Sequence, residues 1–392
     1  MSKFLVLGAG KMGVVLAKDL ILSNDQNIVT LVDISFERLK NARDFISSDR
    51  LISLQRDVED KSQRDGAFKG QDVVLAALLH KHSFLALESA IRQGVHLVDL
   101  VGEKPLERLT HDEEAKKKGI TIIPGCGLAP GIDNICVGRG VHLLDNTEKA
   151  MIYVGGNPLH PQPPLKYSIL YAVESLLDFY ERKTFILEKG KRREAETLSG
   201  IESIKFPHPF SRMECFYTDG LSSLVYTMQG KIKGKLAEKT VRYPGHARAV
   251  RTLKECGLFS CEPLRLKDQE VIPREFLKTL LEERWKLEEE GDVTLMRVIV
   301  SGKKSNKSTT YIFEMVDFFD SENQYTSMAK TTSFPASIAA QMIASGKITQ
   351  RGVLFPENVF QGDLFRPFIK ALKERGVVIS HKREETQDSK VN

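Results

Sequence analysis

A glycine-rich turn between a buried strand and a helix constrains this chain more than any other feature. Residues 3–7 are an apolar run too short for a helix, and Gly8, Gly10 and Gly13 follow in the spacing GxGxxG. Apolar residues then recur at helical spacing over 14–22. The first glycine permits a tight turn, the second lets the backbone approach a pyrophosphate, and the third lets the helix pack on the sheet. The pattern predicts a dinucleotide site at a helix N-terminus.

An acidic residue after the second strand supports this interpretation. Residues 27–32 read as that strand, and Asp33 follows them, twenty residues after Gly13. A carboxylate there accepts hydrogen bonds from both ribose hydroxyls of NAD and repels a 2′-phosphate. Arg38, one helical turn further on, could serve NADP, so we expect NAD and keep NADP open. The alternative is an ordinary glycine turn followed by a surface aspartate.

Strands and helices continue to alternate, with further strands expected at 51–54, 73–79, 96–101 and 119–124. This order predicts an α/β fold with a Rossmann doubly wound parallel sheet. Ligands of such sheets bind at the carboxyl ends of the strands, so residues that follow the strands should contact the cofactor. The predicted cofactor-binding residues are Gly8, Ala9, Gly10, Lys11, Met12, Gly13, Asp33, Asp57, Val58, Ala77, Leu78, Gly127 and Leu128.

The pattern changes after Asn134 and indicates an α+β domain with a largely antiparallel sheet. The expected strands are 149–154, 213–217, 240–243 and a hairpin of 293–300 with 309–318 around a polar loop at 301–306; the expected helices are 134–144, 171–180, 273–285, 333–345 and 367–375. We predict a Rossmann domain over 1–131, a substrate and dimerisation domain over 132–330, C-terminal helices over 331–380, and a frayed polar tail over 381–392.

Composition excludes several other classes of protein. The 57 basic and 52 acidic residues are spread along the chain, without the basic clusters typical of nucleic-acid binding. Five cysteines without CxxC spacing and nine histidines without HxxxH or HExxH spacing predict neither disulfides nor a metal site. No apolar run approaches the roughly 18 residues of a membrane span. The opening MSKFLVLGAG leads straight into a strand, so we expect no signal peptide and a cytoplasmic protein.

Several motifs resemble the saccharopine dehydrogenase family over nearly the whole chain. They are GAGKMG, LVD, VDLVGEKP, IIPGCGLAPGIDN, IYVGGNPLHPQPPLKY, KTVRYPGHA and TTSFPASIAAQMIASGKI. Within the family the chain is most similar to lysine 6-dehydrogenases, because Ala129, Val154 and the run PQPPLKY depart from the reductase pattern. The resemblance implies that the C-terminal helices return to the Rossmann domain. It also implies a homodimer or a dimer of dimers built through the middle domain.

The resemblance implies oxidative deamination of L-lysine. A hydride leaves the ε-carbon for NAD, water hydrolyses the imine to the 6-semialdehyde with release of ammonia, and the aldehyde cyclises to piperideine-6-carboxylate. Such an enzyme must accept a proton from the substrate ammonium and hold the α-carboxylate with cationic or N–H donors.

Three residues are the predicted catalytic residues. Asp99, at the end of the fifth strand, would pair with the substrate ammonium, or else form a structural salt bridge. His80, after the fourth strand, has a suitable intrinsic pKa for a general base, or else is a solvated loop histidine, with Glu103 a weaker candidate. Arg242 matches the family's basic residue in R-Y-x-G and would bind the α-carboxylate, or else form a structural ion pair.

Five further residues are predicted to contact the substrate: Ala129, Pro130, Val154, Tyr243 and His246. Simple packing is the alternative for Tyr243 and His246. Cys126 lies in the same loop as Ala129, but no neighbouring base would activate its thiol, so we interpret it as a small filler.

Two other functions stay open. One is a saccharopine reductase or a relative that acts on an amino-acid imine, which would need a second carboxylate clamp. The other is a nucleotide-sensing protein that kept the Rossmann fold without turnover, since a fold does not by itself establish activity.

Overall fold

The computed structural model describes residues 1–286 and 291–386, which form two compact units. The first unit contains residues 1–145, 222–227 and 329–378, and the second contains 146–221, 228–328 and the chain from 379 onward. The division differs from the predicted boundaries, because the helix after residue 131 and the short segment 222–227 both belong to the first unit.

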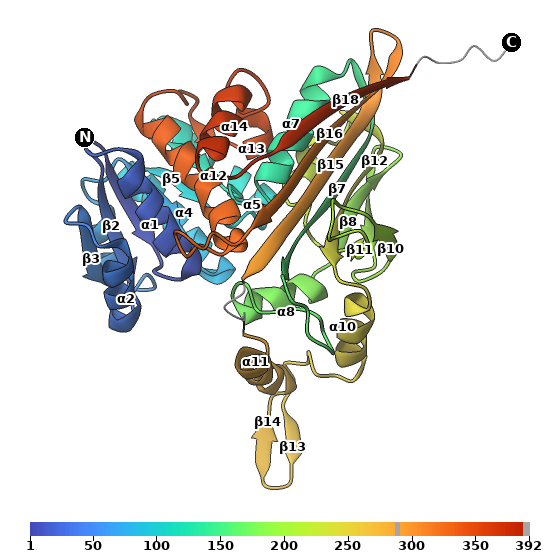
Figure 1. The fold of residues 1–392 in the computed structure, drawn as a ribbon. Helices are drawn as coiled ribbons and strands as arrows, with labels where there is room; N and C mark the ends of the chain where they lie inside the picture. Colours follow the sequence, from blue (N-terminus) through green and yellow to red (C-terminus); the bar gives the residue numbers. More distant parts are fainter. Residues whose placement is uncertain (287–290, 387–392) are drawn as a thin grey trace, which may run out of the picture. The chain divides into compact units, whose positions relative to one another are not determined.

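The first unit is built on a parallel sheet of seven strands (Figure 1). Their order is β3-β2-β1-β4-β5-β6-β17. The strands are β1 (Lys3–Leu7), β2 (Ile28–Asp33), β3 (Leu51–Gln55), β4 (Val73–Ala76), β5 (His96–Asp99), β6 (Thr121–Ile123) and β17 (Gly352–Val353). The order reverses at β1 and β4, and the crevice beyond their carboxyl ends is where doubly wound sheets bind ligands. The predicted fold class is confirmed.

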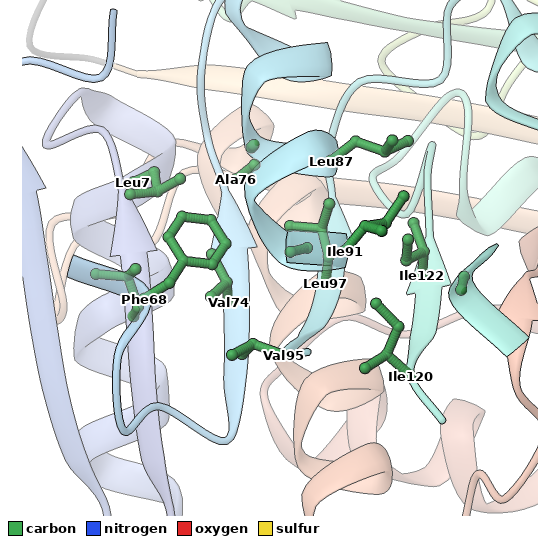
Figure 2. Packing of buried hydrophobic residues seen from close by; sticks show 14 of the residues in the cluster. Leu7, Phe68, Val74, Ala76, Leu87, Ile91, Val95, Leu97, Ile120 and Ile122 are labelled. Carbon is green, nitrogen blue, oxygen red and sulfur yellow. The ribbon is translucent and has the colours of Figure 1, made fainter. Parts of the chain in front are cut away.

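Helices cover this sheet and bury its apolar strands. They are α1 (Lys11–Ser23), α2 (Phe36–Ile46), α3 (Lys61–Phe68), α4 (His80–Gln93), α5 (Pro105–Leu109), α6 (Asp112–Lys117), α7 (Ile132–Leu143), α9 (Leu224–Thr227), α12 (Ser327–Ala344), α13 (Pro356–Val359) and α14 (Phe365–Glu374). Figure 2 shows Leu87 and Ile91 of α4 beside Leu97 and Ile122 of the sheet, all of them buried. Near-continuous apolar strands of this kind are typical of a sheet covered on both faces.

Two late helices are tied to α1 through one buried carboxylate. Ser337 Oγ of α12 donates a hydrogen bond to Asp19 Oδ2 at 2.5 Å, and Arg375 Nε, just after α14, donates one to Asp19 Oδ1 at 2.7 Å. Ser333 Oγ also donates to the carbonyl oxygen of Met12 at 2.9 Å. Residues more than 300 positions apart therefore hold the first helix in place.

The second unit is built on a mixed sheet of nine strands. Its order is β10-β11-β12-β7-β15-β16-β18, with β8 pairing β12 and β9. The strands are β7 (Asn146–Pro158), β8 (Thr184–Glu188), β9 (Lys191–Ala195), β10 (Glu202–Ile204), β11 (Met213–Tyr217), β12 (Ile232–Arg242), β15 (Asp292–Lys304), β16 (Lys307–Phe318) and β18 (Ser380–Thr386). The helices α8 (Val173–Glu181), α10 (His246–Glu255) and α11 (Pro273–Arg284) pack their apolar faces into one core with Phe216. A separate hairpin joins β13 (Leu264–Leu266) and β14 (Gln269–Val271).

Three sequence predictions are wrong in this unit. Residues 381–386 of the tail expected to fray belong to β18, which pairs with β16, and their charged residues suit an edge strand as well as a tail. The rest of the predicted tail, 387–392, lies outside the described residues. The polar loop at 301–306 shrinks to a two-residue turn, Ser305 and Asn306, both with positive φ. Finally, α12 begins at Ser327 rather than Ser333, because the distant Asp292 carboxylate accepts hydrogen bonds from the N–H groups of Ser327 and Met328.

Candidate active site

The glycine-rich turn has the geometry that its spacing predicts. Gly8 has φ +97°, and a Cβ on Gly13 would lie 1.8 Å from the Gly8 carbonyl oxygen. The fold itself therefore requires glycine at both positions, whether or not a ligand binds. Around Gly10, in contrast, a Cβ would meet no protein atom within 4 Å. Gly10 is the N-cap of α1 without a side-chain cap, so the first N–H groups of the helix, from Lys11 and Met12 onward, are available to phosphate oxygens.

Asp33 lies under this turn and is only 7% exposed. Its Oδ2 accepts a hydrogen bond from Ala9 N at 2.8 Å, and its Oδ1 accepts one from Ser35 N, also at 2.8 Å. The guanidinium of Arg38, which is 64% exposed, lies 4.0 Å from Asp33 Oδ2. The carboxylate therefore fixes the glycine turn, and a cation stands at the position where a 2′-phosphate would need one.

The other predicted cofactor residues also follow strands of this sheet. Asp57 and Val58 come after β3, where Val58 packs on the core of the unit. Ala77 and Leu78 come after β4, and the Ala77 carbonyl oxygen would lie 2.5 Å from a Cβ on Gly8. The residues present thus fit a dinucleotide: a phosphate cradle without obstruction at Gly10, an acidic group for the ribose, and strand ends on either side.

The loop after β6 is tightly closed on itself. Gly127 N donates to the Pro130 carbonyl oxygen at 2.9 Å, and a Cβ on Gly131 would lie 1.8 Å from the Gly127 carbonyl oxygen. Leu128 is buried, whereas Ala129 is exposed and Pro130 is half-buried. Cys126 is fully buried, and burial raises the pKa of its thiol, as expected for a filler residue.

Asp133 follows this loop and was missed by the sequence analysis. Its Oδ1 accepts hydrogen bonds from Gly131 N at 3.0 Å and Asn134 N at 2.7 Å, while its buried Oδ2 has no hydrogen-bond partner among the described residues. Burial raises the pKa of Asp133 to about 8, against the lowering effect of those N–H groups. The neighbouring Glu357 is also fully buried and bonds Asn134 Nδ2 and Thr227 Oγ1.

Asp99 is part of a buried ion pair. Its Oδ2 lies 3.1 Å from Arg108 Nη1 and accepts a hydrogen bond from Ser83 Oγ, while its Oδ1 accepts one from Val101 N at 2.9 Å. Both charged side chains are 0% exposed. Burial raises the pKa of the Asp99 carboxyl, and Arg108 opposes that shift. This is the structural salt bridge that the sequence left as the alternative, and it presents no accessible carboxylate to a substrate.

His80 and Glu103 remain as candidate bases in the first unit. His80 is the first residue of α4, directly beyond β4, and Glu103 follows β5; both are half-buried. Each lies at the carboxyl edge of the sheet, where the ligands of this fold bind.

Arg242, at the end of β12, is a buried cation without an acidic partner. It is 3% exposed, and no carboxylate lies within 4.0 Å of it among residues 1–286 and 291–386. Its Nη1 donates to the Val241 carbonyl oxygen at 3.0 Å, and its Nε is buried without a partner in the same part of the chain. The guanidinium lies over the ring of Tyr167, 4.7 Å from the centroid.

Three tyrosines lie around this arginine and form what we call the tyrosine cluster: Tyr167 and Tyr180, which are buried, and Tyr171, which is half-buried. Burial opposes the charge of Arg242, but the tyrosine oxygens outweigh it and the pKa of the guanidinium is raised. Burial likewise raises the pKa of each tyrosine, so the cluster supplies polar oxygens to the cation but no negative charge.

His246 orients this cluster. Its Nδ1 lies 2.8 Å from the Leu165 carbonyl oxygen, which can only accept, so Nδ1 carries the proton and Nε2 accepts from Tyr180 Oη at 2.9 Å. Burial, followed by the charge of Arg242, lowers the pKa of His246 to about 3, so the ring is neutral. The Tyr180 oxygen is then left to face Arg242 as an acceptor.

The other predicted substrate residues of this unit, Tyr243 and Val154, make no hydrogen bond to the Arg242 side chain in the described chain. Tyr243 is half-buried, and its hydroxyl donates to the Pro158 carbonyl oxygen at 3.0 Å. Val154 is buried in the middle of β7 between Thr240 and Met296. The sequence missed Tyr167, Tyr180 and Asn157; the run GGN was a usable signal, because a Cβ on Gly155 would lie 2.6 Å from Arg242 Nη1.

Comparison with known proteins agrees with the fold. The saccharopine dehydrogenase NADP binding domain matches residues 4–123, and the saccharopine dehydrogenase C-terminal domain matches residues 127–377. The solved apo saccharopine dehydrogenase (L-Glu forming) from Saccharomyces cerevisiae has a TM-score of 0.80 at 21% identity, covering 98% of this chain and 100% of its own. That likeness shows the fold.

Two curated relatives match this chain over nearly their full length. Carboxyaminopropylagmatine dehydrogenase of Synechocystis sp. is 22% identical over 96% of both chains. Saccharopine dehydrogenase [NADP(+), L-glutamate-forming] of S. cerevisiae is 21% identical over 96% of this chain and 98% of its own.

The class of this protein follows from its fold, its glycine-rich cradle and these matches: it is a nicotinamide-dinucleotide-dependent oxidoreductase. The chain belongs to the saccharopine dehydrogenase family, as its motifs indicated. Its resemblance to the lysine 6-dehydrogenases stays a prediction. No helix among the described residues is both long and apolar enough to cross a membrane.

Proposed function

We propose that this protein oxidises a carbon–nitrogen bond of an amino-acid substrate, and that the substrate is L-lysine, oxidised at the ε-carbon. The observation that carries this proposal is Arg242. Arg242 is buried and has no carboxylate within 4.0 Å in the described chain, so a bound carboxylate would give it charge-assisted hydrogen bonds that the protein itself does not supply.

The first unit would hold the dinucleotide. Phosphate oxygens would bind the N–H groups at the start of α1, and Asp33 would accept hydrogen bonds from the ribose. The bound nicotinamide would supply the hydride acceptor. We propose that Asp33 favours NAD and that Arg38 would receive the 2′-phosphate of NADP.

The substrate amine must lose a proton before hydride can leave its carbon. We propose His80 as the group that accepts this proton, because it stands at the ligand-binding edge of the sheet and Asp99 is buried in its ion pair. Once hydride has left the ε-carbon, water would hydrolyse the imine to the 6-semialdehyde and ammonia.

Saccharopine is the second candidate substrate. It is favoured by the relatives named saccharopine dehydrogenase [NADP(+), L-glutamate-forming], which match nearly the whole chain. Both candidates carry an α-carboxylate for Arg242, so the two reactions differ in what leaves the oxidised carbon: ammonia from lysine, or an amino acid from saccharopine.

Absorbance at 340 nm tests the proposal directly. Purified protein is mixed with NAD or NADP and then with L-lysine or saccharopine, and ammonia and L-glutamate are assayed in the product. Reduction with lysine and one equivalent of ammonia is the expected result. Reduction only with saccharopine would replace lysine by the second candidate, and reduction with neither would reject both in favour of a nucleotide-binding protein without this activity.

A further inference from the structure

Three polar atoms of the second unit are buried without hydrogen-bond partners in the described chain, and they lie together. They are Arg242 Nε, the Tyr167 hydroxyl and Asn157 Oδ1. Leaving a buried polar group unpaired costs about 1–3 kcal/mol, so native proteins rarely keep one without a reason. Three such atoms, at Arg242 or beside it, point to a bound ligand that supplies their missing hydrogen-bond partners.

Asn157 adjoins Arg242 through a shared backbone acceptor. Asn157 Nδ2 donates to the carbonyl oxygens of Gly155 and Val241, each at 3.3 Å, and Arg242 Nη1 donates to the same Val241 oxygen at 3.0 Å. Because both partners of the amide nitrogen are pure acceptors, the amide cannot be flipped, and its orphaned atom must be the oxygen. Asn157 therefore offers an acceptor beside a cation.

The other two atoms offer donors. Arg242 Nε–H can only donate, and the Tyr167 hydroxyl belongs to the ring over which the guanidinium lies, 4.7 Å from the centroid. The three unpaired atoms thus present two hydrogen-bond donors, one of them charged, next to one neutral acceptor. An α-amino acid has the complementary set on adjacent atoms: a carboxylate that takes the donors and an ammonium that needs an acceptor.

We propose that Asn157 is a specificity-determining residue that binds the α-ammonium group of the substrate, while Arg242 and Tyr167 bind the α-carboxylate. This inference rests on the proposed function in one respect: it takes the pocket at Arg242 to be the substrate-binding site. It holds for lysine and saccharopine alike, because both carry an α-amino-acid headgroup, and it excludes substrates that have a carboxylate alone.

Binding of matched ligand pairs tests this assignment. Isothermal titration with the full chain, in the presence of the reduced dinucleotide to prevent turnover, compares L-lysine with 6-aminohexanoate and L-glutamate with glutarate. Each second ligand lacks only the α-amino group. We expect the wild type to bind at least one amino acid about tenfold to a hundredfold more tightly than its partner.

Two variants separate the roles. Asn157→Leu has nearly the same volume and should reduce this ratio to about one, with binding of the desamino ligand kept. Tyr167→Phe retains the ring over Arg242 and should weaken both members of a pair equally, leaving the ratio unchanged. Retained binding of the desamino ligand and an unchanged unfolding midpoint show that the Asn157→Leu protein is folded; Asn157→Ala replaces it if it is not.

Three results would overturn the inference: a wild type that does not prefer the amino acids, including one that binds neither member; a ratio that survives in Asn157→Leu; or an equal loss of both ligands in that variant. The 340 nm assay is independent of these results. A chain with an Asn157-dependent preference that reduces no dinucleotide with lysine or saccharopine would reject the proposed function and keep the headgroup site.

Discussion

Arg108 and Arg242 are both buried, but their surroundings are opposite. Arg108 in the first unit is 0% exposed and contacts Asp99 at 3.1 Å, with Ser83 and the Glu103 carbonyl oxygen as further acceptors. Arg242 in the second unit is 3% exposed and lies among tyrosines and the Val241 carbonyl oxygen, with no carboxylate within 4.0 Å in the described chain. The first cation is balanced within the chain and so contributes to the fold, whereas we propose that the second binds a ligand.

The largest effect is expected from removing each arginine in turn. Arg108→Met should lower the free energy of unfolding by about 3–5 kcal/mol, because Asp99 is left as an uncompensated buried charge. Arg242→Met should leave stability unchanged or raise it by about 1 kcal/mol, because no described carboxylate loses its partner. Urea unfolding measures both.

The variant with little effect on stability, Arg242→Met, should have a large effect on activity. Arg242→Met should weaken the apparent binding of lysine or saccharopine by about 2–5 kcal/mol, as the loss of a buried partner of the substrate carboxylate. The steady-state ratio kcat/KM reports this change. A variant that loses as much stability as Arg108→Met, or that keeps normal substrate affinity, would return Arg242 to a structural role.

The difference between these regions also explains what sequence could predict. The glycine-rich turn and Asp33 lie within one strand–helix–strand segment, and Gly8 and Gly13 each have a local steric reason that the spacing records. Arg242 was identified only by resemblance. Its neighbours Tyr167 and Tyr180 come from elements more than 60 residues away, and nothing in their own sequence indicates that they meet.

Asp99 is a second residue whose surroundings the sequence could not predict. Its position at a strand end fits a catalytic acid and a structural ion pair equally well. What decides between them is Arg108, nine positions later on α5, whose side chain folds back to the strand end and becomes fully buried. The guanidinium also lies over the ring of Phe84, 4.7 Å from its centroid, and a pattern of residue types does not specify such packing.

Asp133 differs from the balanced Arg108–Asp99 pair of the same unit, because it is a buried carboxyl with one oxygen that has no hydrogen-bond partner in the described chain. With its pKa near 8 when folded and near 3.8 when unfolded, it holds a proton in the folded state across that interval. Its stabilising effect is therefore complete below about pH 4 and is lost as the pH rises through 8. Asp133→Asn should remove this loss.

Unfolding in urea from pH 4 to pH 9 measures the effect. The variant should gain about 3 kcal/mol relative to the wild type by pH 9, since one pKa unit corresponds to about 1.4 kcal/mol and relaxation of the site reduces the full value. A constant difference across this range would mean that Asp133 is ionised throughout in the folded protein.

A substitution at Gly10 tests whether the glycine-rich turn of the first unit binds the phosphates of the dinucleotide. Gly10→Ala should fold normally, because φ is −77° and its Cβ would meet no protein atom within 4 Å, yet it should weaken dinucleotide binding about tenfold or more. Fluorescence titration with NADH and NADPH measures this. Gly66→Ala, equally unobstructed but on α3, is the matched control and should leave binding unchanged. Equal affinities in both variants would place the phosphates elsewhere.

The smallest expected effect concerns the choice between the two dinucleotides. Arg38 is well exposed and stands 4.0 Å from Asp33, so it can approach a 2′-phosphate without breaking any buried contact. Arg38→Ala should weaken NADP binding by about 1 kcal/mol and leave NAD binding unchanged, because an exposed ion pair contributes little more than that. Lys40→Ala removes the same charge from the same helix and controls for a general electrostatic effect. If both variants change NADP affinity equally, or neither does, Arg38 does not contact the phosphate, and the ribose end of the site is then set by Asp33 alone, which favours NAD.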